Sequence, residues 1–215
     1  YRMSSEFHSA AFKKDPENSL QWRHTPKKID AEALRDSMLL ASGKLDLQRP
    51  VGSEIAKRGD GRLGVPRSPR GASAENGELN YRSVYLPAAR DNLPEALALF
   101  DPADPNLVTG KREETNVPDQ ALYLMNNPFV IQQAEAIARR LMTEADTHRE
   151  RFSKAFLLCY ARPATNEEIE ATKAFMQNFL IAAGTDSQNR DKVNNLAFVS
   201  FCQSLLISAE FRYLN

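Results

Sequence analysis

Apolar residues recur every three or four positions in two parts of the chain, a short stretch near residue 30 and most of the last hundred residues. In the short stretch, Leu34 and Met38 would lie on one face of a helix. Asp30 precedes them, where a side chain can accept hydrogen bonds from the free N–H groups of a first helical turn. Gly43 follows them and can take the left-handed conformation that ends a helix. The pattern therefore predicts a helix over residues 30–42.

The last hundred residues predict four further helices. Pro128 interrupts the first, and it should kink or split that helix because proline removes a backbone hydrogen bond. Pro163 follows the second, which must end before it. We place the four helices at 118–143, around Phe152 to Cys159, from a capping box at Thr165–Glu168 to Gly184, and at 191–212. Consecutive helices with short connections are typical of an antiparallel bundle, which we predict over residues 116–212.

Between these helical regions the periodic pattern is lost. Residues 43–80 hold seven of the nine glycines and no aromatic residue, so we expect a long, flexible loop inserted in the domain. Residues 81–86 alternate in a β-like way and are expected to form a short strand. Residues 87–118 hold five prolines and are expected to be irregular, apart from a short helix over 95–100. The fold class predicted over 1–215 is therefore mainly α: an antiparallel helical bundle with an irregular Pro-rich middle segment, a long Gly-rich loop and at most one short β-strand pair.

The first 28 residues are polar and mixed. The chain opens on YRMSSEFHS, which resembles the end of an element that starts upstream. We therefore interpret the chain as a fragment of a larger protein. The single tryptophan, Trp22, is expected to anchor this segment on the body, because a large apolar ring gains most by burial.

Composition limits the possible partners. Lys plus Arg number 28 and Asp plus Glu number 28, whereas nucleic-acid binders usually carry a basic excess, so we predict no nucleic-acid partner. A local basic excess over 57–70 is interpreted as a solvated loop, with binding to a nucleic acid or an anionic surface as the alternative. The most apolar stretch, from Leu196 to Ala209, is shorter than the roughly 20 residues that a membrane helix needs. We therefore predict a buried helix there and no transmembrane segment.

The two cysteines, Cys159 and Cys202, form neither a CxxC nor a CxxCH motif, so this chain encodes no zinc ribbon and no covalent haem attachment. We expect two buried thiols that pack as small apolar groups. The alternatives are a disulfide between two packed helices and a catalytic thiol.

No sequence motif of a known catalytic or phosphate-binding site is present. GDGRLG at 59–64 has dinucleotide-binding glycine spacing, but no strand precedes it and no helix follows it. His8, His24 and His148 lie too far apart in the sequence to suggest a metal site, and none is predicted. Asp101 and Asp104 are expected to bind nearby backbone N–H groups, with a cation or general-acid role as the alternative.

Charged and amide side chains gather in the helix at 30–42 and in the irregular middle. We expect ion pairs between them that fix the irregular chain on the bundle, because a guanidinium can hold a carboxylate with two hydrogen bonds. If they instead line one pocket, they would form an uncharacterised hydrolytic or redox site. The candidate residues are Glu32, Arg35, Asp36, Arg82, Asp101, Arg112, Gln120 and Asn126.

Several strings resemble one protein family in the same order along the chain. Residues 27–36 resemble R-R-L-D-A-E-x-x-R-D, residues 81–85 resemble Y-R-R-S-V-Y, and residues 112–130 resemble R-x-x-T-x-x-P-x-Q-A-L-x-L-M-N-x-P-F-V. Arg162 to Glu168 and the string from Ser208 to Leu214 extend the similarity, although Ala161 stands where that pattern prefers glycine. Together they resemble the C-terminal domain of large, exported, cytochrome-c-associated proteins of planctomycetes and related bacteria, a domain family of unknown function. The chain resembles only the C-terminal part of that family domain, beginning at Tyr1 to Ser5.

The resemblance implies a context rather than a reaction. It implies an extracytoplasmic location, the upstream domains of the same polypeptide as partners, and a c-type haem in those domains, with no cofactor in this chain. No catalytic residue carries over, because the family has no established activity. We therefore expect a non-catalytic structural or interaction module, which contacts the upstream domains, a cytochrome domain among them, or a surface glycan. The alternative is an enzyme domain built on the candidate polar residues.

Overall fold

The structure is a computed structural model, and it describes residues 3–52, 79–86, 93–103, 108, 110–184 and 189–214. The predicted Gly-rich loop therefore lies mostly outside the described residues, as do Asp104 and parts of the Pro-rich segment. The described part is mainly helical, with one two-stranded antiparallel sheet, and this confirms the predicted mainly α fold with at most one short β-strand pair.

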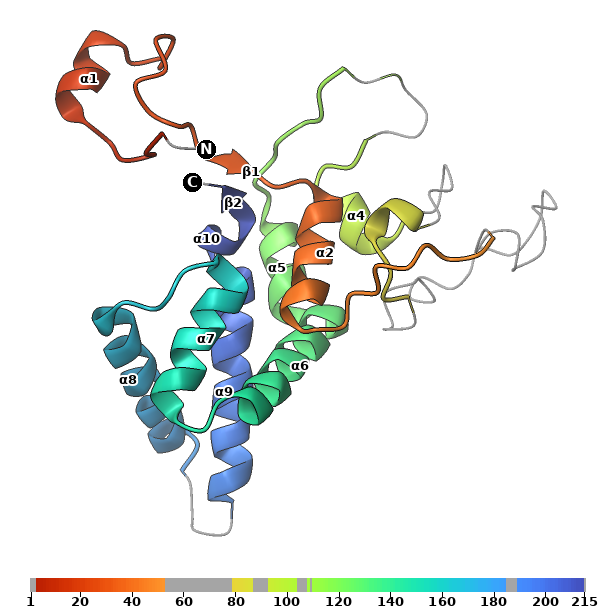
Figure 1. Cartoon of the computed structure of the whole chain (residues 1–215), viewed down its shortest axis with the longest axis vertical. Coiled ribbons are helices and arrows are strands. Elements are labelled where there is room, and N and C mark those ends of the chain that lie inside the picture. The colour runs from red at the N-terminus through yellow and green to blue at the C-terminus, as the bar shows by residue number, and fades with distance from the viewer. Residues whose placement is uncertain are drawn as a thin grey trace.

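The described part of the C-terminal half contains six helices. These are α5 (Pro118–Asn126), α6 (Pro128–Glu144), α7 (His148–Tyr160), α8 (Asn166–Ala182), α9 (Arg190–Ile207) and α10 (Ala209–Arg212). Helix α9 is the central element, because it packs against α5, α6, α7 and α8 (Figure 1). Its buried residues Phe198, Phe201, Cys202, Leu205 and Leu206 follow the helical period that the sequence shows.

Local sequence features explain where most of these helices begin and end. Pro128 splits α5 from α6, and the side chain of Asn127 caps the new helix by accepting a hydrogen bond from the Phe129 N–H. Thr165 and Glu168 form the predicted capping box of α8. The predicted helix over 191–212 is interrupted at Ser208, whose hydroxyl accepts the Phe211 N–H and starts α10.

In the N-terminal half, the described residues add one long helix to this core. The elements are α1 (Ser9–Lys14), β1 (Lys27–Lys28), α2 (Ala31–Ala41), the 3₁₀ turn η1 (Ser83–Tyr85) and α4 (Glu95–Leu99). Helix α2 packs on α6 and is covered by α4 and η1. It ends at Gly43 with a positive φ of 73°, as predicted, but the Asp30 side chain makes no capping hydrogen bond, so that prediction is wrong.

The only sheet in the described residues joins two distant parts of the chain. Strand β1 pairs antiparallel with β2 (Tyr213–Leu214), with Lys28 opposite Tyr213. The strand predicted at 81–86 does not form, because residues 83–85 turn as η1 and Tyr81 makes only an isolated bridge with Asp46.

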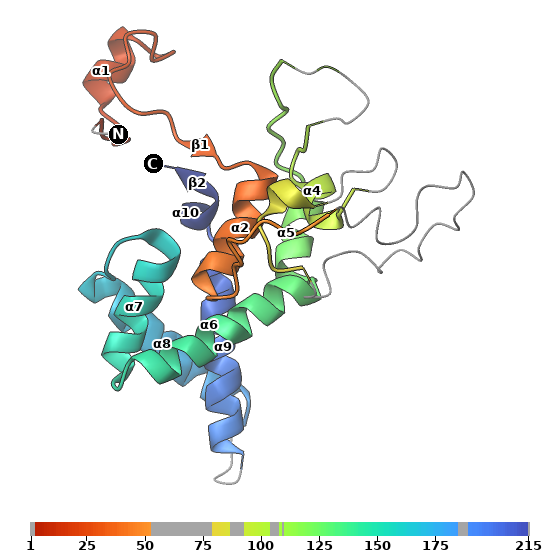
Figure 2. The same cartoon turned by 45° about the vertical axis from the view of Figure 1, so that its right-hand side comes forward.

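The first described residues form an arm, which we define as residues 3–26. Both views show its helix α1 apart from the helical body (Figure 1, Figure 2). Trp22 anchors the arm on itself rather than on the body: its indole N–H donates to the Asp15 carbonyl, and its ring lies 6.1 Å from the Phe7 ring. Within the described residues, no helix combines the length and apolarity needed to cross a membrane.

Both cysteines are free thiols. Cys202 is buried and Cys159 is half-buried. Burial raises the pKa of Cys159 to about 12 and also raises the pKa of Cys202. Because the thiolate is the reactive form, these environments disfavour the catalytic-thiol interpretation.

Candidate functional site

The candidate polar residues divide into separate contacts around α2. The first centres on Lys28, which is buried beneath the irregular segment. Its ammonium donates to Asp101 Oδ2 at 3.0 Å, to the Thr115 carbonyl at 2.6 Å and to Gln120 Oε1 at 3.1 Å. Asp101 also accepts the N–H and the hydroxyl of Thr115, at 2.9 and 2.6 Å. Lys28 thus ties the start of α2 to the segment that leads into α5.

The electrostatics of Asp101 follow from these bonds. Burial alone would raise the pKa of Asp101, but the bonds from Thr115 and Lys28 outweigh burial and hold the pKa below its usual value. Asp101 itself adopts a positive φ of 57°, an uncommon conformation for a residue with a side chain. The carboxylate is therefore ionised, and it fixes this turn by accepting the Thr115 N–H. This agrees with the sequence prediction that Asp101 binds a nearby backbone N–H group.

The second contact surrounds Arg35 and Asp36 on α2. Arg35 is only 3% exposed, and its guanidinium donates to the carbonyl of Leu79, to the carbonyl of Tyr81 and to the Ser83 hydroxyl. Asp36 accepts the N–H and hydroxyl of Ser83 at 2.7 and 2.6 Å. These bonds hold η1 against α2. Arg82 lies at the edge, with its Nε 3.9 Å from Asp36 Oδ2.

The third contact is the ion pair of Glu32 and Arg112. The guanidinium binds both carboxylate oxygens, at 2.6 and 3.1 Å. Burial alone would raise the pKa of Glu32, but the bond to Arg112 outweighs it and lowers that pKa, while the same bond raises the pKa of Arg112. Asn126 is not part of this region: its amide donates to the Leu122 carbonyl one turn earlier on α5.

A cleft of about 310 Å³ lies beside β1. One wall is residues 27–30, the other is residues 111–114, and Phe100 and Asp101 complete it. Of the eight candidates, only Asp101 and Arg112 line it. The candidates therefore do not converge on one pocket, and the charges of Asp101 and Arg112 are already paired within the fold.

A further ion-pair cluster was not singled out from the sequence. Arg162 binds both oxygens of Glu168, at 2.9 and 2.7 Å, and both oxygens of Glu210, at 2.6 and 2.8 Å. Its guanidinium also lies over the rings of Phe156 and Tyr160. The bond to Arg162 lowers the pKa of Glu168 to about 2. The Arg-Pro string pointed to this position, but only the fold brings Glu210 to it.

These contacts define a class of protein: a helical scaffold on which paired charges hold long irregular segments. The chain belongs to the PSD1 family, described as a protein of unknown function (DUF1553), and the family's sequence model matches residues 1–176. This match over residues 1–176 confirms that the chain resembles a family of unknown function. No curated protein and no solved structure matches the chain.

Proposed function

We propose that this chain is an interaction module of a larger extracytoplasmic protein and that it docks onto the upstream domains, a c-type cytochrome domain among them. One observation carries the proposal: most of the candidate polar residues are paired within the fold, whereas aromatic side chains are exposed on the arm. Buried pairs such as Lys28 with Asp101 stabilise irregular chain. The arm offers apolar surface that a partner would cover.

The arm carries the side chains that protein interfaces favour. Phe7 is 57% exposed and Phe12 is 40% exposed, and their ring centroids lie 5.2 Å apart. The Arg23 guanidinium lies 5.0 Å from the centroid of the Trp22 ring. Aromatic and arginine side chains are enriched at the buried centres of interfaces and dominate their binding energy.

The arm is also fixed in shape before it meets a partner. The Asp15 carboxylate accepts the N–H groups of Ser19 and Leu20, at 3.0 and 2.7 Å. Asn18 bridges the turn by donating to the Arg23 carbonyl at 2.8 Å. Binding by such a segment loses less conformational entropy than binding by a disordered one. The arm is therefore suited to recognise a protein surface.

Chemical cross-linking of the full-length protein tests the docking. Lys13 and Lys14 are exposed on α1 and should form cross-links to upstream domains. The double substitution of Phe7→Ser and Phe12→Ser should remove most of these cross-links. Ile181→Ser is the matched control, because Ile181 is 77% exposed on α8, and it should leave them unchanged. An arm without cross-links to upstream residues, or with cross-links that survive the double substitution, contradicts the proposed docking.

The cytochrome context has its own test. An absorption spectrum and an intact mass of the full-length native protein should show a haem Soret band and the added mass of covalent haem. If neither the Soret band nor the added mass is found, the association with a cytochrome is refuted. Docking onto other upstream domains is then tested by the cross-links alone.

A further inference from the structure

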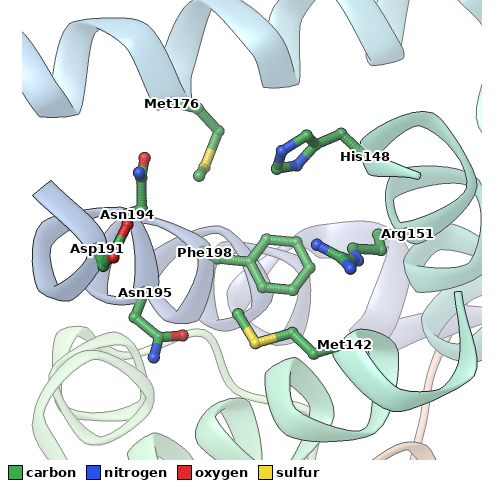
Figure 3. A pocket seen from close by; sticks show the side chains of 8 residues that line it. All are labelled: Met142, His148, Arg151, Met176, Asp191, Asn194, Asn195 and Phe198. Carbon is green, nitrogen blue, oxygen red and sulfur yellow. The ribbon is translucent and has the colours of Figure 1, made fainter. Parts of the chain in front are cut away.

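A second pocket, of about 250 Å³, brings together side chains from α6, α7, α8 and α9 (Figure 3). Two of the five methionines of the chain line it, Met142 on α6 and Met176 on α8. The buried ring of Phe198 on α9 lies between their thioether groups. Thioether sulfur is soft and polarisable, so these side chains offer donor atoms of a kind that oxygen-lined sites lack.

His148, the first residue of α7, adds an imidazole to this pocket. Its ring lies 6.2 Å from the Phe152 ring, which in turn lies 6.3 Å from the Phe198 ring. Figure 3 shows the His148 imidazole and the Met176 thioether on the same side of the Phe198 ring, where both face one space, whereas Met142 lies on the opposite side. The fold therefore places one nitrogen donor and one sulfur donor together, and they come from two different helices.

The chemistry of these donors selects the kind of ion that they can hold. A thioether is a soft ligand that selects Cu(I), and imidazole binds copper as well. Both ligands are neutral, and the other charged residues of the lining, Arg151 and Asp191, bring one positive and one negative charge. The pocket therefore has no excess negative charge to attract a divalent cation. Among the residues that the structure describes, no three His, Cys, Asp or Glu side chains are grouped to hold a metal ion. The donor set thus favours a soft monovalent ion.

We propose that this pocket binds Cu(I) between a ring nitrogen of His148 and the Sδ atom of Met176. A Cu(I) ion has a filled d shell and accepts two ligands in a line, so this pair is a sufficient ligand set. The Phe198 ring covers one side of the site. The sequence offered His148 no histidine partner, because its partner is a methionine that only the packing of α7 against α8 brings near.

Calorimetric titration of the purified protein with Ag(I), in chloride-free buffer, tests the proposal. Ag(I) has the same soft character and charge as Cu(I) and is not oxidised by air. It should bind with a dissociation constant of about 10 µM or lower. Met176→Leu and His148→Gln should each weaken binding by at least about tenfold, because each removes one of the two ligands. Met142→Leu is the matched control: it removes a thioether from the other side of the Phe198 ring and should change binding by less than about twofold.

All proteins in this comparison carry Cys159→Ser, because a half-buried thiol would bind Ag(I) itself, whereas Cys202 is buried. Circular dichroism of each variant establishes that the fold is retained, and His148 is exposed, so His148→Gln is expected to fold. The proposal is overturned if Ag(I) does not bind at about 100 µM. It is equally overturned if folded His148→Gln binds Ag(I) like its parent, if Met142→Leu weakens binding as much as Met176→Leu, or if Zn(II) binds as tightly as Ag(I).

Discussion

Arg35 shows how a charged residue on a polar-looking helix face can become part of a core. Its guanidinium lies 5.5 Å from the centroid of the Phe129 ring and binds the backbone of the segment before η1. The sequence groups it only with the charged side chains of the helix at 30–42, because helical periodicity carries no information on a segment that lies 44 residues or more away in the chain. Buried charge needs such partners, and only the tertiary fold supplies them.

We expect Arg35→Leu to lower the free energy of unfolding by about 2–4 kcal/mol, since two backbone carbonyls and Ser83 would lose a buried donor. Urea denaturation measures the change. Arg82→Leu is the control, because Arg82 approaches the same Asp36 but its side chain is 55% exposed, and it should cost under about 1 kcal/mol. Equal losses in the two variants would contradict the structural role of Arg35.

The Arg162 cluster predicts how stability depends on pH. The folded pKa of Glu168 is about 2 against an ordinary value of 4.5, so its contribution is present above pH 4.5 and is lost as the pH falls towards 2. We expect Glu168→Gln to lower the free energy of unfolding at pH 7 by about 1 kcal/mol, a small value because the side chains of the Arg162–Glu168 pair are 36% and 29% exposed. The difference between parent and variant should shrink between pH 4.5 and 2, measured by urea denaturation at each pH. A difference that stays constant over this range would show that the ion pair does not carry the effect.

At the scale of elements, the end of α7 offers a direct test of backbone strain. Ala161 caps this helix with φ +57° and ψ 21°, a left-handed conformation that glycine adopts without a Cβ clash. We expect Ala161→Gly to raise the free energy of unfolding by about 1 kcal/mol. Ala183→Gly is the control at the end of α8, where φ is −75°, and it should bring no gain. A gain at both positions would contradict the strain argument.

The elements that the sequence predicts well are those fixed by neighbours in the chain. The capping box at Thr165 and the break at Pro128 depend on residues within one helical turn, so their positions are readable. The strand predicted at 81–86 fails because Asp36 and Arg35 bind Ser83 and turn the chain there. The β1–β2 pair joins Lys28 with Tyr213, and no local pattern marks such a pairing.

At the scale of the whole molecule, the sequence indicated paired charges on the irregular chain but not which charges meet. Glu32 and Arg112 do meet, whereas Asn126 lies apart from the other candidates, and Lys28 was not among the candidates at all. A lysine within a two-residue strand carries no sequence mark of burial. Its partners come from α5 and from the segment between α4 and α5, which only the packed fold assembles.

The central claim is that the arm docks onto another part of a larger protein. Hydrogen–deuterium exchange of the full-length protein tests this most directly, because amides covered by a partner exchange slowly. We expect the amides of residues 3–26 to exchange at least about tenfold more slowly in the full-length protein than in the same protein carrying Phe7→Ser and Phe12→Ser. If these amides exchange equally fast in both proteins, the arm is not covered and the claim is wrong.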